Sequence, residues 1–270
     1  MRRLLWLIFC CLSAGPALGN ESAMRTLATA DQGRGWEAVG RLNIGHSGFC
    51  TGTLIEPALV LTAAHCLYDP QTGALHDAAD FEFLAGWRNG RAVAYRTVRR
   101  AVAHPDYVYE GRNRVDRVEY DLALLELDQP IRLPTLPPFA IGGDPRNGDS
   151  VGLVSYAVDR AEAPALEEDC RVLGRQPGVL VLSCSVESGS SGAPVFRIRD
   201  GRPEIVSVVS AKAEMNGERV AIGPLMEQPL RELRQAYAAG GARFRKPGGA
   251  SAFAAGAGGA RTSGARFVRP

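Results

Sequence analysis

Short apolar runs separated by glycine, proline and other turn residues recur from Trp36 to Ile222, and they constrain the fold more than any other feature. The runs contain β-branched residues, a pattern typical of antiparallel β-strands. They cover residues 38–42, 49–55, 58–62, 81–86 and 92–102, and then 150–158, 170–173, 179–186, 193–198, 205–210 and 219–222. The spacing therefore predicts an all-β body.

One segment has helical spacing instead. Apolar residues recur at intervals of three and four within residues 229–239, and two glycines follow as a stop signal. Residues 130–149 are rich in proline and glycine, as expected for a linker between two lobes. Residues 20–35 are polar and lack periodicity, which predicts either a propeptide or a flexible arm.

Composition and charge narrow the class of protein. The 270 residues are 46% hydrophobic, enough for a sizeable core in one domain or in two small domains packed together. A net charge of +2 argues against a general nucleic-acid binder. Residues 241–270 are rich in glycine and alanine and carry six basic residues and no acid, so we expect a basic, disordered tail. Without that tail and the two arginines at the start, 23 basic residues remain against 29 acidic ones.

Residues 1–19 have the pattern of an export signal. Two arginines precede the apolar stretch 4–12, and Ala17-Leu18-Gly19 is a small-residue cleavage pattern. The apolar stretch is too short to span a bilayer, and no later stretch is long enough. A lipidation signal at Cys10 or Cys11 is the weaker interpretation, because large residues precede both cysteines. We therefore predict a secreted or periplasmic protein without a transmembrane segment.

Removal of that signal would leave four cysteines, Cys50, Cys66, Cys170 and Cys184. In an oxidising compartment four cysteines allow three pairings, of which Cys50–Cys66 with Cys170–Cys184 is the most local. Metal binding is the competing interpretation, but no two of these cysteines have the spacing of a metal site. We therefore expect no metal at these positions.

A turn of small residues, Glu187-Ser188-Gly189-Ser190-Ser191-Gly192, precedes the apolar run at 193–198. Its glycines lack β-carbons, so backbone N–H groups can approach a ligand closely. One of its serines is a candidate nucleophile, which needs a base to take its proton and an acid to orient that base. Upstream, Leu61-Thr62-Ala63-Ala64-His65-Cys66 supplies an imidazole, and Asp121 heads the apolar run 121–125. Because an unpaired buried charge is costly, Asp121 should have a partner.

Taken together, these three stretches resemble the chymotrypsin-like (trypsin-fold) serine endopeptidases, whose triad residues occur in the order His, Asp, Ser. Subtilisins and α/β-hydrolases have other orders, which these residues do not match. The resemblance implies that His65 is the general base, Asp121 its orienting acid, and Ser191 the nucleophile in the frame Gly-x-Ser-Gly-x-Pro. It also implies an oxyanion hole made by the backbone N–H groups of Gly189 and Ser191. The implied fold is two antiparallel β-barrels with a C-terminal helix.

The same resemblance implies roles for residues around the triad. In this family a bridge like Cys50–Cys66 lies beside the histidine, a serine matching Ser210 hydrogen-bonds the triad aspartate, and the histidine matching His104 is structural. Ser185 would lie at the base of the substrate pocket, with Ser210 and Lys212 along its wall. No aspartate occupies that base, so cleavage after arginine or lysine is not favoured. Lys212 either attracts acidic side chains or is a solvated surface residue.

One departure from the family concerns activation. Many animal members have an aspartate directly before the nucleophile, and it pairs with a new N-terminal amine after zymogen cleavage. This chain has Ser190 at that position and lacks an Ile-Val-Gly-Gly start. It is therefore more similar to the bacterial branch, which includes glutamyl-endopeptidase-like enzymes. We expect its oxyanion hole to form without such a switch.

The resulting prediction is a signal peptide at 1–19, an arm or propeptide at 20–35, one barrel at 36–134, a second barrel with the helix at 135–240 and a tail at 241–270. The predicted function is hydrolysis of peptide bonds in protein or peptide substrates through an acyl-enzyme, by a monomer without metal or organic cofactor. Two alternatives stay open. One is a catalytically silent binding module of the same fold, and the other is a protein that its basic tail holds on polyanions.

Overall fold

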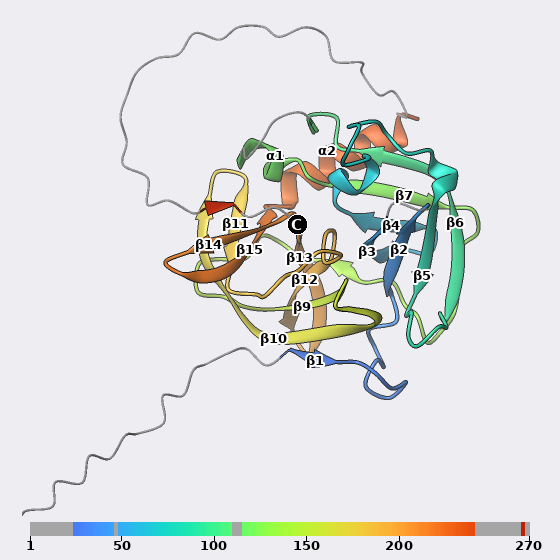
Figure 1. The fold of residues 1–270 in the computed structure, drawn as a ribbon, viewed down its shortest axis with the longest axis horizontal. Helices are drawn as coiled ribbons and strands as arrows, with labels where there is room; N and C mark the ends of the chain where they lie inside the picture. Colours follow the sequence, from blue (N-terminus) through green and yellow to red (C-terminus); the bar gives the residue numbers. More distant parts are fainter. Residues whose placement is uncertain (1–23, 46–47, 110–114, 241–265, 268–270) are drawn as a thin grey trace, which may run out of the picture.

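The computed structural model describes residues 24–45, 48–109, 115–240 and 266–267, which form a mostly β structure and confirm the predicted fold class. Figure 1 shows two halves side by side, a barrel formed by β2 to β7 and a second sheet formed by the later strands. The predicted signal peptide at 1–19 and most of the predicted tail lie outside the described residues.

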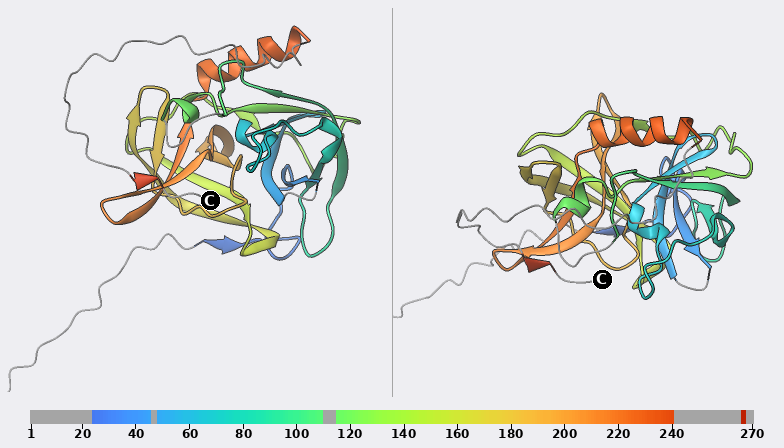
Figure 2. Two further views of the ribbon diagram at one scale, coloured as in Figure 1. Left: turned by 45° about the horizontal axis from the view of Figure 1, so that its top comes forward. Right: turned by 90° about the horizontal axis from the view of Figure 1, so that it is seen from above.

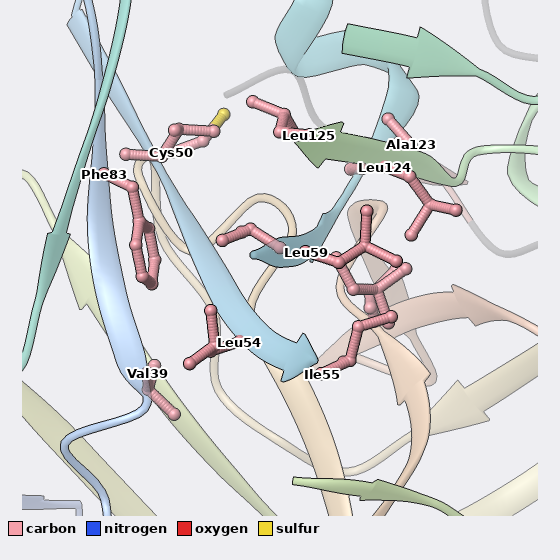
Figure 3. Close-up of a cluster of buried hydrophobic side chains, with 14 of the residues drawn as sticks. Val39, Cys50, Leu54, Ile55, Leu59, Phe83, Ala123, Leu124 and Leu125 are labelled. Carbon is pink, nitrogen blue, oxygen red and sulfur yellow. The ribbon is translucent and has the colours of Figure 1, made fainter. Parts of the chain in front are cut away.

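The first half is a closed antiparallel barrel in the order β2-β3-β4-β7-β6-β5. Its strands are β2 (Val39–Ile44), β3 (Gly48–Glu56), β4 (Leu59–Thr62), β5 (Phe81–Ala85), β6 (Ala94–Ala103) and β7 (Ala123–Leu127). Figure 3 shows Leu54, Phe83 and Leu124 among the side chains that fill it. The same buried cluster includes Tyr156 and Phe196 from the second half, so it joins the two halves, and the second half has a further buried cluster of its own.

The second half is a ten-stranded sheet rather than a second closed barrel, with the path β16-β14-β15-β11-β10-β9-β12-β13-β8 and with β1 paired to β10. The described strand pairs are antiparallel except for β13 with β8. Its strands are β1 (Arg25–Thr26), β8 (Ala140–Ile141), β9 (Ser150–Ala157), β10 (Arg160–Gln176), β11 (Val179–Leu182), β12 (Pro194–Arg199), β13 (Arg202–Val208), β14 (Ala211–Met215), β15 (Glu218–Pro224) and β16 (Arg266–Phe267).

Two segments that we expected to be irregular pair with this sheet. Residues 24–35, predicted as part of a propeptide or flexible arm, begin with β1, and Leu27 is fully buried while its N–H donates to the Pro164 carbonyl at 2.8 Å. Within the predicted disordered tail, β16 pairs with β14, Phe267 opposite Ala213. An open strand edge offers unpaired backbone groups, so it can take up a further segment of chain.

Helix α2 (Glu227–Ala238) corresponds to the predicted helix and lies across the barrel, as Figure 2 shows. Its residues Leu230 and Leu233 are buried, and the Asp144 carboxylate accepts the N–H groups of Met226 and Glu227 at its start, at 3.0 and 3.2 Å. The predicted linker therefore caps this helix. Within the described residues no helix has both the length and the apolar character to cross a membrane.

Three short helical segments complete the fold. The 3₁₀ helices are η1 (Ala64–Leu67), which follows β4, and η2 (Ala78–Asp80), which precedes β5. The short helix α1 (Val115–Glu119) lies between β6 and β7. It leads directly into Asp121, whose N–H donates to the Val118 carbonyl at 3.2 Å. Two of these segments, η1 and α1, thus position candidate site residues.

Candidate active site

His65 lies in η1, directly after barrel strand β4. Its neighbour Cys66 is bonded to Cys50 of β3, so a disulfide attaches this short helix to the barrel. The His65 backbone N–H donates to Asp121 Oδ1 at 2.8 Å, and the ring Nδ1 lies 2.7 Å from Asp121 Oδ2. Because an ionised carboxylate only accepts hydrogen bonds, Nδ1 carries the hydrogen in this pair. The Nε2 lone pair of the neutral ring is then available as a base.

Asp121 is 2% exposed, although it carries a charge. Besides the two bonds from His65, the Ser210 hydroxyl donates to Asp121 Oδ2, as the resemblance implies. Three donors compensate the loss of hydration that burial imposes on the carboxylate. Burial and, to a smaller extent, the charge of Asp121 raise the pKa of Tyr107 and Tyr68, so both phenols stay neutral beside the site.

Ser191 lies in the turn between β11 and β12. Gly189 and Gly192 of this turn have φ angles of 96° and 76°, which favour glycine. A β-carbon on Gly192 would lie 2.1 Å from Thr62 Oγ1 and 2.8 Å from the Ala63 nitrogen, so the turn packs directly on the residues before His65. The described residues include no hydrogen bond between the Ser191 hydroxyl and His65. Backbone packing is therefore what places the two segments together.

The backbone N–H groups of the turn fall into two sets. Those of Ser190, Gly192 and Ala193 donate to carbonyl groups of the protein, at 2.9, 2.8 and 2.9 Å. Within the part of the chain that the structure describes, those of Ser188, Gly189 and Ser191 donate to no protein group, and Gly189 and Ser191 are alternate residues. Two N–H groups on alternate residues are therefore available to an anionic oxygen of a ligand, which is the requirement for an oxyanion hole.

The residues predicted for the substrate pocket make contacts of three kinds. The Ser185 N–H donates to Oε2 of the fully buried Glu167 at 2.9 Å. The Ser210 hydroxyl is directed at Asp121, while Lys212 Nζ lies 3.1 Å from Glu187 Oε2. Lys212 is therefore part of an ion pair rather than a free cation, and the pocket assignment stays a prediction.

Sequence reasoning missed Thr51, a buried residue of β3 that connects the barrel to the turn. Its N–H donates to the Ser191 carbonyl at 2.8 Å, and its hydroxyl donates to the Gly189 carbonyl at 2.9 Å. The hydroxyl also accepts the Tyr156 N–H at 3.1 Å. Because these partners are more than a hundred residues away in sequence, no local pattern indicates the contact.

Among the described residues, three clusters bring potential metal ligands together. Two of them depend on disulfide-bonded cysteines, since Cys50–Cys66 and Cys170–Cys184 are both bonded, which is the most local of the three pairings. A disulfide sulfur does not supply the thiolate that a metal needs. In the third cluster, His104 Nδ1 already accepts the Asp106 N–H, and Nε2 faces Glu232 at 3.3 Å. None of the three clusters therefore offers a free set of ligands.

Comparison with known proteins agrees with this geometry. The chain is 26% identical over 172 residues to the glutamyl endopeptidase of Bacillus licheniformis, covering 63% of this chain and 52% of that protein. It is 36% identical over 86 residues to the modular serine protease of Drosophila melanogaster, covering 31% of this chain and 14% of that protein. The chain thus spans about half the length of the first relative and less of the second.

Two solved structures share the fold. The structure of a Glu endopeptidase in complex with MPD has a TM-score of 0.67 at 21% identity, over 81% of this chain and 98% of that one. Protease Anisep from Arthrobacter nicotinovorans has a TM-score of 0.59 at 17% identity, over 80% and 100%. A sequence profile of the trypsin-like peptidase domain matches residues 50–204, which is more than half of the chain. This protein is therefore a member of the trypsin-like peptidase domain family.

Proposed function

We propose that this protein is a secreted or periplasmic serine endopeptidase, with His65, Asp121 and Ser191 as its catalytic triad. The observation that carries the proposal is the buried Asp121 carboxylate, which is hydrogen-bonded to His65 Nδ1 and to Ser210. A second observation supports it, because the N–H groups of Gly189 and Ser191 are unused in the described part of the chain. The predicted export signal and the two disulfides support the location.

In the proposed reaction the Ser191 oxygen attacks the carbonyl carbon of the peptide bond while its proton moves to His65 Nε2. Asp121 stabilises the imidazolium and holds the ring in place. The negative charge that forms on the carbonyl oxygen is bound by the two N–H groups of Gly189 and Ser191. The imidazolium then gives its proton to the leaving amine, which leaves an acyl-enzyme. Water, deprotonated by His65, hydrolyses the ester and regenerates the hydroxyl.

The proposed substrates are proteins or peptides, with a preference against basic residues at the cleavage site. Lys212 of the predicted pocket wall and the neighbouring Arg219 both contact Glu187, at 3.1 and 2.6 Å, so two positive charges face one negative charge there. The similarity to a glutamyl endopeptidase supports an acidic side chain at the cleavage site. A peptide library with glutamate, alanine or lysine at that position measures the preference directly.

A fluorophosphonate probe tests the proposed nucleophile. We expect the full secreted chain to hydrolyse a peptide substrate and to be labelled at Ser191, and we expect Ser191→Ala to lose both properties. Ser188→Ala is the matched control, because Ser188 lies in the same turn and is half-buried. It should keep both. A folded wild-type protein that neither reacts with the probe nor cleaves any peptide would support the silent binding module instead.

A further inference from the structure

The residue directly before the proposed nucleophile is held by neutral groups and one buried cation. Ser190 is fully buried, and its hydroxyl faces the Tyr156 carbonyl at 3.3 Å, the Ser155 hydroxyl at 3.4 Å and the Glu187 N–H at 3.4 Å. The Arg160 guanidinium approaches the same oxygen, with Nη2 at 3.5 Å. The side of the turn that faces the protein interior therefore contacts Arg160.

Arg160 begins β10, directly after the chain reverses from β9. Its side chain is 12% exposed, and Nη2 donates to the buried Ser155 hydroxyl at 2.9 Å while Nη1 contacts Asp159 at 3.1 Å. Its Nε is buried and has no hydrogen-bond partner in the described part of the chain. Placing a cation there costs desolvation energy, which a purely apolar side chain would avoid.

Two of the acidic residues around Arg160, Glu167 and Glu187, contact residues predicted for the substrate pocket. Burial lowers the pKa of Arg160, while Asp159, Glu167 and Glu187 oppose that shift by favouring the charged form. Glu167 accepts the Ser185 N–H, and Glu187 is the first residue of the turn. The guanidinium thus lies among acidic groups at the N-terminal end of the turn.

We propose that Arg160 is a positioning residue, whose guanidinium holds Ser190 inward through Ser155 and so keeps the N–H groups of Gly189 and Ser191 directed at the substrate. This inference rests on the proposed function. Many animal members of the family order this turn by pairing an aspartate before the nucleophile with an N-terminal amine. This chain has Ser190 at that position, and the contact with Arg160 would order the turn instead. Arg160 does not contact the reacting atoms in this arrangement.

The test compares Arg160→Met, which keeps most of the volume, with Arg160→Lys, which restores the charge. For Arg160→Met we expect kcat to fall about tenfold to a hundredfold, below the loss of a whole oxyanion donor, with little change in KM. Affinity for a peptide boronate, which forms a tetrahedral adduct, should fall by the same factor as kcat/KM, whereas affinity for a product peptide should not. Arg160→Lys should recover part of kcat.

Arg197→Met is the matched control, because Arg197 is similarly buried at 23% exposure and is paired with Asp149 and Glu204 away from the turn. It should leave kcat unchanged. If Arg160→Met does not fold, Ser190→Ala removes the facing hydroxyl and should lower kcat in the same selective way. Unchanged kcat in the folded variant, or equal losses of boronate and product affinity, would overturn the positioning role. Full activity of Ser191→Ala would instead refute the proposed function itself.

Discussion

At the scale of single residues, Asp121 shows how one buried charge organises the candidate site. Its carboxylate is almost inaccessible, and each of its oxygens accepts at least one hydrogen bond. The donors come from η1 and from the segment between β13 and β14, so both halves of the molecule contribute to them. Losing any of these bonds would leave a buried acceptor unpaired and reduce the stability of the folded state. The positions of His65 and Ser210 are therefore coupled through Asp121.

His104 is a second buried titratable residue, with a side chain that is fully buried. Its Nδ1 accepts the Asp106 N–H at 3.2 Å, its Nε2 lies 3.3 Å from Glu232 of α2, and its ring stacks on Tyr120. Burial lowers its pKa below the ordinary value of 6.5, and the nearby carboxylates of Asp106 and Glu232 oppose this shift only in part. The folded protein therefore holds His104 neutral at a pH where the unfolded chain already binds a proton.

We therefore predict that His104 makes the stability of the protein pH-dependent. Below pH 6.5 the unfolded state binds more protons at this residue than the folded state does. The free energy of unfolding is therefore at its full value above pH 6.5 and falls as the pH drops below it. His104→Gln removes the titration. Urea unfolding between pH 8 and pH 5 should show a steeper loss for the wild type than for this variant. Parallel curves for the two proteins would contradict the prediction.

At the scale of elements, the sequence predicts those whose own periodicity carries the signal. The strands of the barrel and helix α2 follow from alternation and from helical spacing. The short helix α1 and strands β1 and β16 do not, because a segment of two to five residues is fixed by the surface on which it packs. The periodicity of the strands also does not determine how the second half closes. A second barrel was implied by the resemblance alone, and the structure has a ten-stranded sheet there.

The candidate site divides along the same line. The sequence indicates the proposed triad residues His65, Asp121 and Ser191 because each lies in a short motif of distinctive composition. Arg160 and Thr51 are not, because each acts on the turn from a strand distant in sequence and neither lies in a distinctive motif. Motifs thus indicate the chemistry, and the groups that orient it become visible only in three dimensions.

The two disulfides close loops of almost equal length, with sequence separations of 16 and 14 residues. Replacing either pair by alanine should therefore cost a similar amount of stability, about 3 kcal/mol for a loop of this size. Their effects on catalysis should differ. Cys50–Cys66 attaches η1, so its loss should lower kcat, whereas loss of Cys170–Cys184, next to Ser185, should act on KM.

Thermal unfolding and peptide hydrolysis of the two double variants measure these effects, and each variant is the control for the other. We expect comparable losses of stability, with a change mainly in kcat for the Cys50–Cys66 variant and mainly in KM for the Cys170–Cys184 variant. If both variants lose kcat to the same extent, the bridge beside His65 has no special role in placing the imidazole.

At the scale of the whole molecule, the two halves are joined by a common core and by hydrogen bonds that cross between them. Tyr156 donates its hydroxyl to the Trp87 carbonyl at 2.8 Å, and Trp87 donates its indole N–H to the Ala161 carbonyl at 3.2 Å. Tyr156 is buried in the same cluster as barrel residues such as Phe83. The candidate site lies along this junction, so its geometry depends on how firmly the halves are held together.

Thr51 is where that dependence can be measured. Its hydroxyl joins the Gly189 carbonyl of the turn to the Tyr156 N–H of β9, and all three residues are buried. Thr51→Val keeps the shape but leaves both polar groups without this partner, which should cost about 1–3 kcal/mol per unpaired group. Thr51→Ser keeps the hydroxyl and should cost less. Because the lost bonds hold the proposed oxyanion turn, the free energy of unfolding, measured in urea, and kcat should both fall in Thr51→Val. Equal stability of the two variants would show that the hydroxyl does not couple the halves.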